Sequence, residues 1–237
     1  LWKLNPLTRK GKISLSDFAN GYDYFGLHKT EKGWVFREWA PNATDIYLIG
    51  DFNGWQESPK YRAKRIKGTG NWELKLSEKA MKHGDLFKMK VHWEGGEGER
   101  IPAWANRVVQ DEQTKIFSAQ VWNPEPYKWK KKTFRPNTTP LLIYECHIGM
   151  GQDAEKVGTY TEFKEKVLPR IIEDGYNCIQ IMAIQEHPYY GSFGYHVSSF
   201  FAASSRFGTP EELKSLIDTA HQNGIAVIMD IVHSHAV

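Results

Sequence analysis

Residues 209–232 read TPEELKSLIDTAHQNGIAVIMDIV, and this stretch decides the class of fold. Thr209 is suited to cap a helix whose first residue is Pro210, and Glu212, three residues after the cap, completes a capping box. Leucine, isoleucine and alanine then recur at helical spacing until a glycine ends the pattern. The apolar run 225–232 follows directly and is typical of a strand buried on both faces. The stretch therefore predicts a helix that leads into a strand of a parallel sheet.

Two more strands and one more helix are predicted before this stretch. Residues 141–148 and 178–184 are apolar runs, and 161–174 has an apolar face at helical spacing, although Pro169 should kink that helix. Buried strands that alternate with helices permit a doubly wound sheet or a barrel, and three strands do not decide between them. Three parallel strands would also leave a long hydrophobic edge open, so we expect further polypeptide to complete this domain.

The first half of the chain has a different pattern. Residues 14–25 predict a short helix capped by Ser14 or Ser16, and short β-type runs separated by glycine and asparagine turns follow. The expected strands are 33–39, 46–49, 72–76, 86–93 and 116–121. This spacing predicts an all-β, immunoglobulin-like sandwich. We therefore expect an N-terminal helical segment at 1–25, the sandwich at 26–122, a proline-rich linker at 123–140 and the α/β part at 141–237.

The composition excludes several classes of function. With 41% hydrophobic and 25% charged residues, the chain has the composition of a soluble globular protein, and no apolar run reaches the length of about 18 residues that a membrane-spanning helix needs. The net charge of +3 is too balanced to favour nucleic acid, and the basic cluster near residue 130 is interpreted as a solvated linker. Cys146 and Cys178 lie in apolar runs, which predicts buried free thiols in a reducing compartment.

Ligands of parallel α/β folds meet the loops at the carboxyl ends of the strands. Asp230 lies inside the third apolar strand, where a buried carboxylate needs a partner, and it is placed either to hydrogen-bond a sugar or to fix a turn. Together with His233 and His235 it also suggests a metal site, but no recognised zinc spacing is present and we expect no metal or other cofactor. Tyr195, which follows a glycine in an aromatic-rich loop, is the candidate for a ring that stacks on a sugar.

One aromatic residue of the predicted sandwich is also a candidate. Trp55 ends the turn DFNGW, where burial is difficult, and it is either a packing residue or a platform for a sugar ring. Lys88 lies on a predicted strand among apolar residues and would support the binding interpretation by supplying a hydrogen-bond donor.

At these motifs the sequence resembles known families. GDFNGW at 50–55, preceded by REWAP at 37–41, is similar to the glycogen-binding (family 48) carbohydrate module. Four further motifs resemble the first part of the α-amylase superfamily barrel: YECHIGM at 144–150, MAIQEH at 182–187, GYH at 194–196 and DIVHSH at 230–235. The string SSFFAASSRFGTPEEL at 198–213 resembles the eukaryotic-type starch and glycogen branching enzymes.

The resemblance implies a fold and a set of glucan contacts. The fold is a β-sandwich followed by the first three β/α units of a (β/α)8 barrel. In the module, the implied contacts are Trp55 and Lys88, with Trp39, Pro41 and Asn71 beside them, while Trp93 is offset from the second stacking tryptophan of related modules. At the cleavage site, the implied contacts are Tyr195 stacked on the glucose, His235 hydrogen-bonded to it, Asp230 in support and His187 close by.

The resemblance also implies a reaction. A carboxylate nucleophile and a carboxylic acid would carry out double displacement with retention, and the 6-hydroxyl of another glucan chain would accept the glycosyl group. In this family those carboxylates belong to later strands, so no catalytic residue is expected in these 237 residues. The expected partners are a glycogen, amylose or amylopectin polymer and the remainder of the barrel, in the cytoplasm or, in a photosynthetic source, the plastid. The rival hypotheses are a non-catalytic glucan-binding protein and a debranching or hydrolytic member of the superfamily.

Overall fold

The computed structural model describes residues 12–137 and 140–234, and the chain forms two compact units. Unit 1 consists of Leu1–Ala105 and Ala119–Val121, and unit 2 consists of Asn106–Ser118 and Trp122–Val237. The expected division after residue 122 therefore differs from the observed one, because Asn106–Ser118 belongs with unit 2. Among the described residues, no helix has the length and apolar character needed to cross a membrane.

Unit 1 begins with two short helices, α1 (Leu15–Phe18) and α2 (Gly21–Tyr24), in place of the single helix expected at 14–25. Ser14 caps α1, since its hydroxyl accepts a hydrogen bond from the Asp17 N–H at 3.0 Å while the Asp17 carboxylate accepts one from the Ser14 N–H.

Two antiparallel sheets follow, as expected for the all-β part. The first has the order β1-β2-β5-β4, formed by β1 (Gly26–Thr30), β2 (Gly33–Trp39), β5 (Asn71–Leu76) and β4 (Lys64–Arg65). In the second, β6 (Leu86–Trp93) pairs with β3 (Ala43–Gly50), β7 (Gly96–Arg100) and β9 (Phe117–Gln120). Strand β8 (Val108–Gln110) is next to β9 in the strand order and belongs, with the first two residues of β9, to unit 2. Alternate residues are buried in both sheets, for example Trp34 and Phe36 on β2 and Ile46 and Leu48 on β3.

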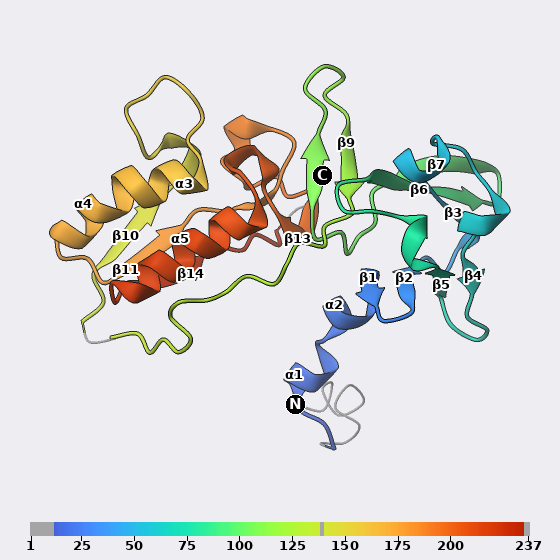
Figure 1. Cartoon of the computed structure of the whole chain (residues 1–237), viewed down its shortest axis with the longest axis horizontal. Coiled ribbons are helices and arrows are strands. Elements are labelled where there is room, and N and C mark those ends of the chain that lie inside the picture. The colour runs from blue at the N-terminus through green and yellow to red at the C-terminus, as the bar shows by residue number, and fades with distance from the viewer. Residues whose placement is uncertain (1–11, 138–139, 235–237) are drawn as a thin grey trace. The chain divides into compact units, whose positions relative to one another are not determined.

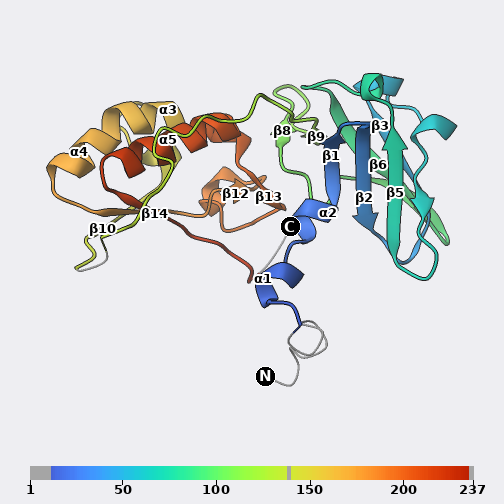
Figure 2. The same ribbon diagram turned by 60° about the horizontal axis from the view of Figure 1, so that its bottom comes forward.

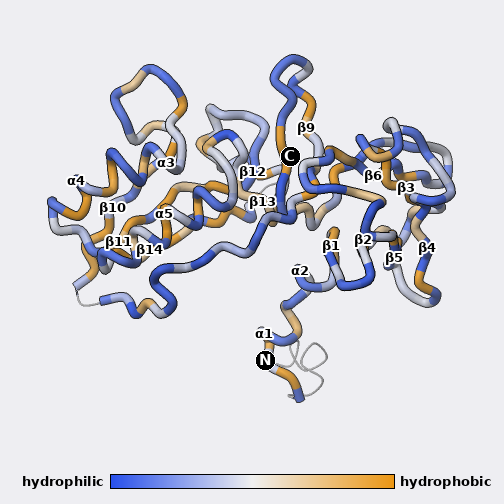
Figure 3. The backbone as a smooth tube through the Cα atoms, in the orientation of Figure 1, coloured by the Kyte–Doolittle hydropathy of each residue, from blue (hydrophilic) through white to orange (hydrophobic). Residues whose placement is uncertain are grey.

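Unit 2 contains the three predicted parallel strands, β10 (Ile143–Cys146), β11 (Cys178–Ile181) and β14 (Ala226–Met229), paired in that order. Helices α3 (Tyr160–Glu162), α4 (Leu168–Glu173) and α5 (Pro210–Gln222) lie on one side of this sheet (Figures 1 and 2). Strand β14 and most of β11 are hydrophobic, as Figure 3 shows. A small antiparallel pair, β12 (Gln185–Glu186) with β13 (Ser199–Ala203), follows β11.

The capping box predicted for α5 is confirmed. The Thr209 hydroxyl accepts a hydrogen bond from the Glu212 N–H at 3.2 Å, and Glu212 Oε2 accepts one from the Thr209 N–H at 2.7 Å. Leu213, Leu216 and Ala220 are buried against the sheet, as their spacing predicts.

Pro169 does not end the helix in which it was expected to cause a kink. A π-helical turn at Phe163–Val167 joins α3 to α4 directly before the proline. A proline ring would clash with the carbonyl group four residues earlier and cannot donate a hydrogen bond, and the wider π turn relieves both problems. The helix therefore continues with a local widening.

The opposite face of the β10-β11-β14 sheet has no helix over it among the described residues. Tyr144, Ile179 and Val227 pack against the helices, so their neighbours in the alternation point the other way. Ile143 is 43% exposed and Ile228 39%, and both lie on this uncovered face. The uncovered face is the one that a further layer or the interior of a barrel would occupy.

The expected linker has no helix or strand among its described residues, but it is held against α5. Asp218, which is 1% exposed, accepts hydrogen bonds from the Lys130 and Lys131 N–H groups at 2.9 Å each and from the Tyr127 hydroxyl at 3.2 Å. The side chains of the basic cluster remain exposed, in agreement with the sequence analysis, while their backbone is fixed.

Candidate functional site

Trp55 lies in the turn that follows β3. Asn53 shapes this turn, because its amide accepts a hydrogen bond from the Gly50 N–H at 2.9 Å and donates one to the Leu48 carbonyl at 3.0 Å. Trp55 has a φ of +62°, which costs about 1–2 kcal/mol for a residue with a side chain. Its indole N–H donates to Asp51 at 3.0 Å, and the ring is half-buried rather than enclosed. This strained, partly exposed placement favours a platform over a packing residue.

A cavity of about 270 Å³ lies beside Trp55. Its wall includes the side chains of Glu57, Lys90 and Glu99. Lys88 reaches the same wall, since its ammonium group pairs with Glu99 at 2.9 Å and its side chain is only 14% exposed. The structure thus brings Trp55 and Lys88 to one site, where an aromatic ring adjoins donors and acceptors suited to sugar hydroxyls.

The same region contains the one cluster of possible metal ligands among the described residues, Glu57, His92 and Glu97. The two carboxylates contact opposite nitrogens of the imidazole, with Nε2 at 2.8 Å from Glu57 and Nδ1 at 3.2 Å from Glu97. A single ion coordinates only one imidazole nitrogen, so this arrangement suits a hydrogen-bonded group better than a metal site.

Trp39, Pro41 and Asn71 form a second group, which does not line the cavity beside Trp55. Trp39 is paired with Asn71 in the first sheet, is 61% exposed, and lies with Pro41 against the turn at Gly70. This group precedes the first residue of β3, whereas Trp55 follows its last. The two groups are therefore on different sheets, with Trp39 and Asn71 on the first and the cavity beside Trp55 on the second.

Trp93 is also distant from Trp55. It pairs with Ala43 at the first residue of β3, and its ring lies 5.6 Å from the Arg100 guanidinium. Trp93 therefore supplies no second ring to the site at Trp55.

In unit 2 the structure brings Tyr195 and Asp230 together. The Tyr195 hydroxyl donates to Asp230 Oδ2 at 2.9 Å, and the Asp230 N–H donates to the Ile181 carbonyl at 3.0 Å. The hydrogen bond to Asp230 raises the pKa of Tyr195, and burial and the negative charges of Asp230 and Glu145 raise it further. The phenol therefore stays protonated, and the carboxylate keeps free lone pairs for sugar hydroxyls. The half-buried Tyr195 ring packs against the cluster of Ala183, Val197 and Val232.

Glu145, at the carboxyl end of the first parallel strand, is a further neighbour of this pair. It lies on β10 on the uncovered face of the sheet, and it is exposed. A charged residue inside an apolar strand was the signal that identified Asp230, and the same signal applies to Glu145.

His187 lies in the interior, so its expected contact with a glucose at the cleavage site is not possible in this structure. It is 0% exposed, its Nδ1 lies 2.9 Å from the Gln185 carbonyl, and its Nε2 has no hydrogen-bond partner among the described residues. Burial lowers its pKa. His147 is buried nearby with a pKa lowered by burial and then by the charge of His187, so both rings favour the neutral form.

The last candidate histidines do not form a metal site with Asp230 in the described part of the chain. His235 lies outside the described residues. His233 stacks on Phe200, with ring centroids 5.4 Å apart, and Asp230 is bonded to Tyr195.

Comparisons with known proteins agree with this geometry. The family model of carbohydrate-binding module 48 (isoamylase N-terminal domain) matches residues 24–105, and that of the alpha amylase catalytic domain matches residues 153–237. A 1,4-alpha-glucan-branching enzyme of Dictyostelium discoideum is 46% identical over 231 residues, covering 94% of this chain and 34% of the relative. That of Saccharomyces cerevisiae is 46% identical over 255 residues, covering 100% of this chain and 36% of the relative.

A pullulanase from Bacillus acidopullulyticus shares the fold, with a TM-score of 0.72, 19% identity, and coverage of 90% of this chain and 30% of that chain. The chain spans about a third of the length of the curated relatives that it matches. By sequence, over nearly all of its length, this chain is related to the 1,4-alpha-glucan-branching enzymes, and it joins a carbohydrate-binding module 48 to part of an alpha amylase catalytic domain.

Proposed function

We propose that this chain is part of a 1,4-alpha-glucan branching enzyme, which cleaves an α-1,4-linked glucan and transfers the released chain to a 6-hydroxyl to make an α-1,6 branch. The observation that carries the proposal is the relation to branching enzymes over 94% of the chain, which extends through both units. A debranching or hydrolytic enzyme would share the module and the barrel but is less well supported by that relation.

In this proposal the residues of the chain bind and orient glucan. Trp55 and Lys88 hold the polymer on the module, and Tyr195 and Asp230 hold a glucose at the carboxyl ends of the parallel strands. The uncovered face of the β10-β11-β14 sheet forms the inner wall of a (β/α)8 barrel, which further polypeptide completes. The nucleophile and the acid/base of a retaining mechanism would belong to that further polypeptide.

An iodine-stain assay on amylose with the native protein tests the reaction. Branching shortens the linear stretches that bind iodine without releasing sugar, so we expect the blue colour to fade with no rise in reducing ends. Reducing ends that rise in step with the loss of colour would contradict branching and support hydrolysis.

The intact mass of the native protein tests the remaining rival, a non-catalytic glucan-binding protein. A mass about three times the 27.3 kDa of this chain is expected, because the chain spans about a third of its relatives. A native, folded protein of 27 kDa that binds glucan would contradict the proposal.

A further inference from the structure

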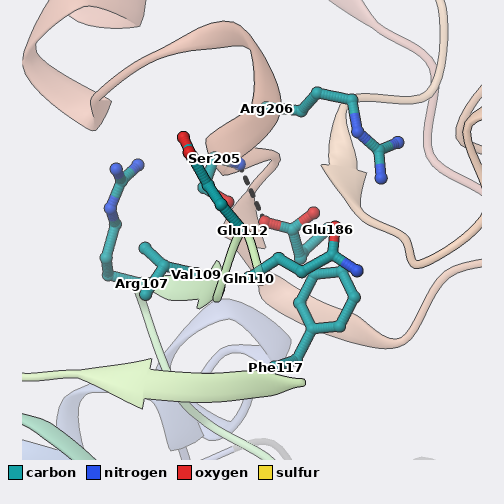
Figure 4. A pocket seen from close by; sticks show the side chains of 8 residues that line it. All are labelled: Arg107, Val109, Gln110, Glu112, Phe117, Glu186, Ser205 and Arg206. Atoms are coloured by element: carbon teal, nitrogen blue, oxygen red, sulfur yellow. Dashed lines mark hydrogen bonds between the residues drawn. The ribbon is translucent and has the colours of Figure 1, made fainter. Parts of the chain in front are cut away.

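A cavity of about 330 Å³ lies within unit 2, away from the residues assigned above to glucan. Its walls come from Asn106–Ser118, β12 and the turn Ser205–Phe207. Figure 4 shows Gln110, Phe117, Glu186 and Arg206 grouped around it. The volume is at the lower end of the range for small-molecule sites, about 300–1,000 Å³.

Two arginine side chains of this cavity are held in place and keep unused donors. Arg107 is 8% exposed, donates to the Gly208 carbonyl at 2.7 Å and lies 4.8 Å from the centre of the Trp122 ring. Arg206 donates to the Pro188 carbonyl at 3.2 Å. Among the described residues, Nε of Arg107 and Nη1 of Arg206 have no hydrogen-bond acceptor. Both atoms are closed off from solvent, so a ligand in the cavity would meet other N–H groups of the two guanidiniums.

Glu186 supplies the complementary acceptor. Its carboxylate is 1% exposed and accepts hydrogen bonds from the His187 N–H at 3.1 Å, the Ser204 hydroxyl at 3.3 Å and the Ser205 N–H at 2.7 Å. An ionised carboxylate has about four lone-pair sites, so about one remains for a ligand.

The charges and surfaces of the cavity select the class of ligand. Arg107 and Arg206 are balanced by Glu186 and by Glu112 at the exposed side, so an anion would meet as much repulsion as attraction. The half-buried Phe117 ring adds an apolar surface. A neutral molecule that has an apolar ring face and hydroxyls able both to donate and to accept fits this combination.

We propose that this cavity is an accessory binding site for one or two glucosyl residues of an α-glucan. The site is separate from Trp55 and from the Tyr195–Asp230 pair. The choice of a glucan as the ligand rests on the proposed function, whereas the class of a neutral, polyhydroxylated ring rests on the cavity itself.

The test is a titration of the native protein, deuterated and ¹⁵N-labelled, with maltose, in a Trp55→Ala background that removes binding at the module turn. We expect saturable shifts of the backbone amides of Val109, Gln110, Phe117 and Arg206. If none of these amides shifts when maltose is raised to tens of millimolar, the proposal is overturned. Larger shifts of the same amides with inorganic phosphate than with maltose would also overturn it, because they would indicate an anion site.

A pair of matched variants tests the role of the ring. Phe117→Ala should weaken maltose binding about fivefold to tenfold, the scale of a lost aromatic contact. Ile116→Ala changes the preceding residue, which is 52% exposed and does not line the cavity, and should leave binding unchanged. Equal maltose affinities of the two variants would overturn the proposal. If Phe117→Ala fails to fold, the maltose-induced amide shifts in the protein with Phe117 intact decide the outcome.

The outcome is distinguishable from that of the proposed function. Saturable, Phe117-dependent maltose binding supports the accessory site even if the native protein fails to branch amylose. Branching activity without any maltose-induced shift at the cavity would overturn the accessory site and leave the proposed function in place.

Discussion

Replacement of Asp218 by alanine should release the segment between the two halves of the chain from α5. The buried carboxylate accepts two backbone hydrogen bonds from that segment, both 2.9 Å long, and one from the phenol of Tyr127. The Tyr127 hydroxyl is partly accessible and can turn to water, so we count only the backbone bonds. At about 1.5 kcal/mol each for a charged acceptor, they stabilise the docked segment by about 3 kcal/mol.

Trypsin is a suitable probe, because the segment carries five exposed basic side chains, Lys128, Lys130, Lys131, Lys132 and Arg135. When the released segment docks again on α5 faster than trypsin cleaves it, the cleavage rate is proportional to the fraction of molecules in which the segment is undocked. A loss of about 3 kcal/mol raises that population roughly a hundredfold, so Asp218→Ala should be cut in this segment about a hundred times faster than the parent chain. Asp218→Asn keeps one acceptor oxygen and should show about a tenfold increase.

Glu165→Ala is the matched control, since it removes an exposed acidic side chain from another helical turn of unit 2. If Asp218→Ala is cut no faster than this control, the hydrogen bonds do not hold the segment and the reasoning fails. Acidification gives an independent check. Burial raises the pKa of Asp218, but the hydrogen bonds outweigh burial and the pKa lies below its ordinary value of 3.8. The contribution is therefore complete above about pH 4 and is lost as the pH falls through the lowered pKa, which amide exchange at Lys130 and Lys131 would report.

Three further results are expected. Trp39→Ala and Trp55→Ala should each weaken binding to glycogen by about 1–1.5 kcal/mol in affinity electrophoresis. Their effects should add in the double variant, because the two rings belong to separate groups. Strong non-additivity would place both rings at one site. Asp230→Asn should lower the raised pKa of Tyr195 towards its ordinary value of 10.0 in NMR of ¹³C-labelled tyrosine, and an unchanged midpoint would mean that their hydrogen bond does not persist in solution. Both cysteines should resist Ellman's reagent until the chain is denatured, because burial raises the thiol pKa, in Cys146 to about 12, and rapid labelling of the folded chain would contradict their burial.

Local signals explain which elements the sequence predicts well. The helix after Thr209 and the strand after it are specified within one stretch by a cap, a spacing and a terminating glycine, and both are present. Strand β7 (Gly96–Arg100) was missed because glycine and glutamate have low strand propensity, and its conformation comes from pairing with β6. The widened turn before Pro169 likewise depends on packing along the rest of the helix, which no single residue reveals.

The candidate site was predicted in part for the same reason. Tyr195 follows one predicted strand and Asp230 lies near the carboxyl end of another, and the geometry of a parallel sheet brings such strand ends together. His187 occurs in the same loop by sequence, but packing turns its ring into the interior, beside His147. Arg107 could not be predicted as a residue of the cavity in unit 2, because its hydrogen-bond partner Gly208 is 101 positions away and no sequence periodicity links the two.

In the proposed function, the separation of Trp39 and Trp55 gives the module a preference that neither residue provides alone. Trp39 lies on the first sheet and Trp55 lies beside the cavity of the second, so the two rings are not placed to contact the same short oligosaccharide. A long glucan that contacts one ring is held near the other, so its second contact forms at an effective concentration set by the chain between them. Maltose gains nothing from this arrangement, whereas glycogen or amylose gains affinity without any new contact. In the proposed function, the separation of the two candidate groups therefore favours polymer over short sugars.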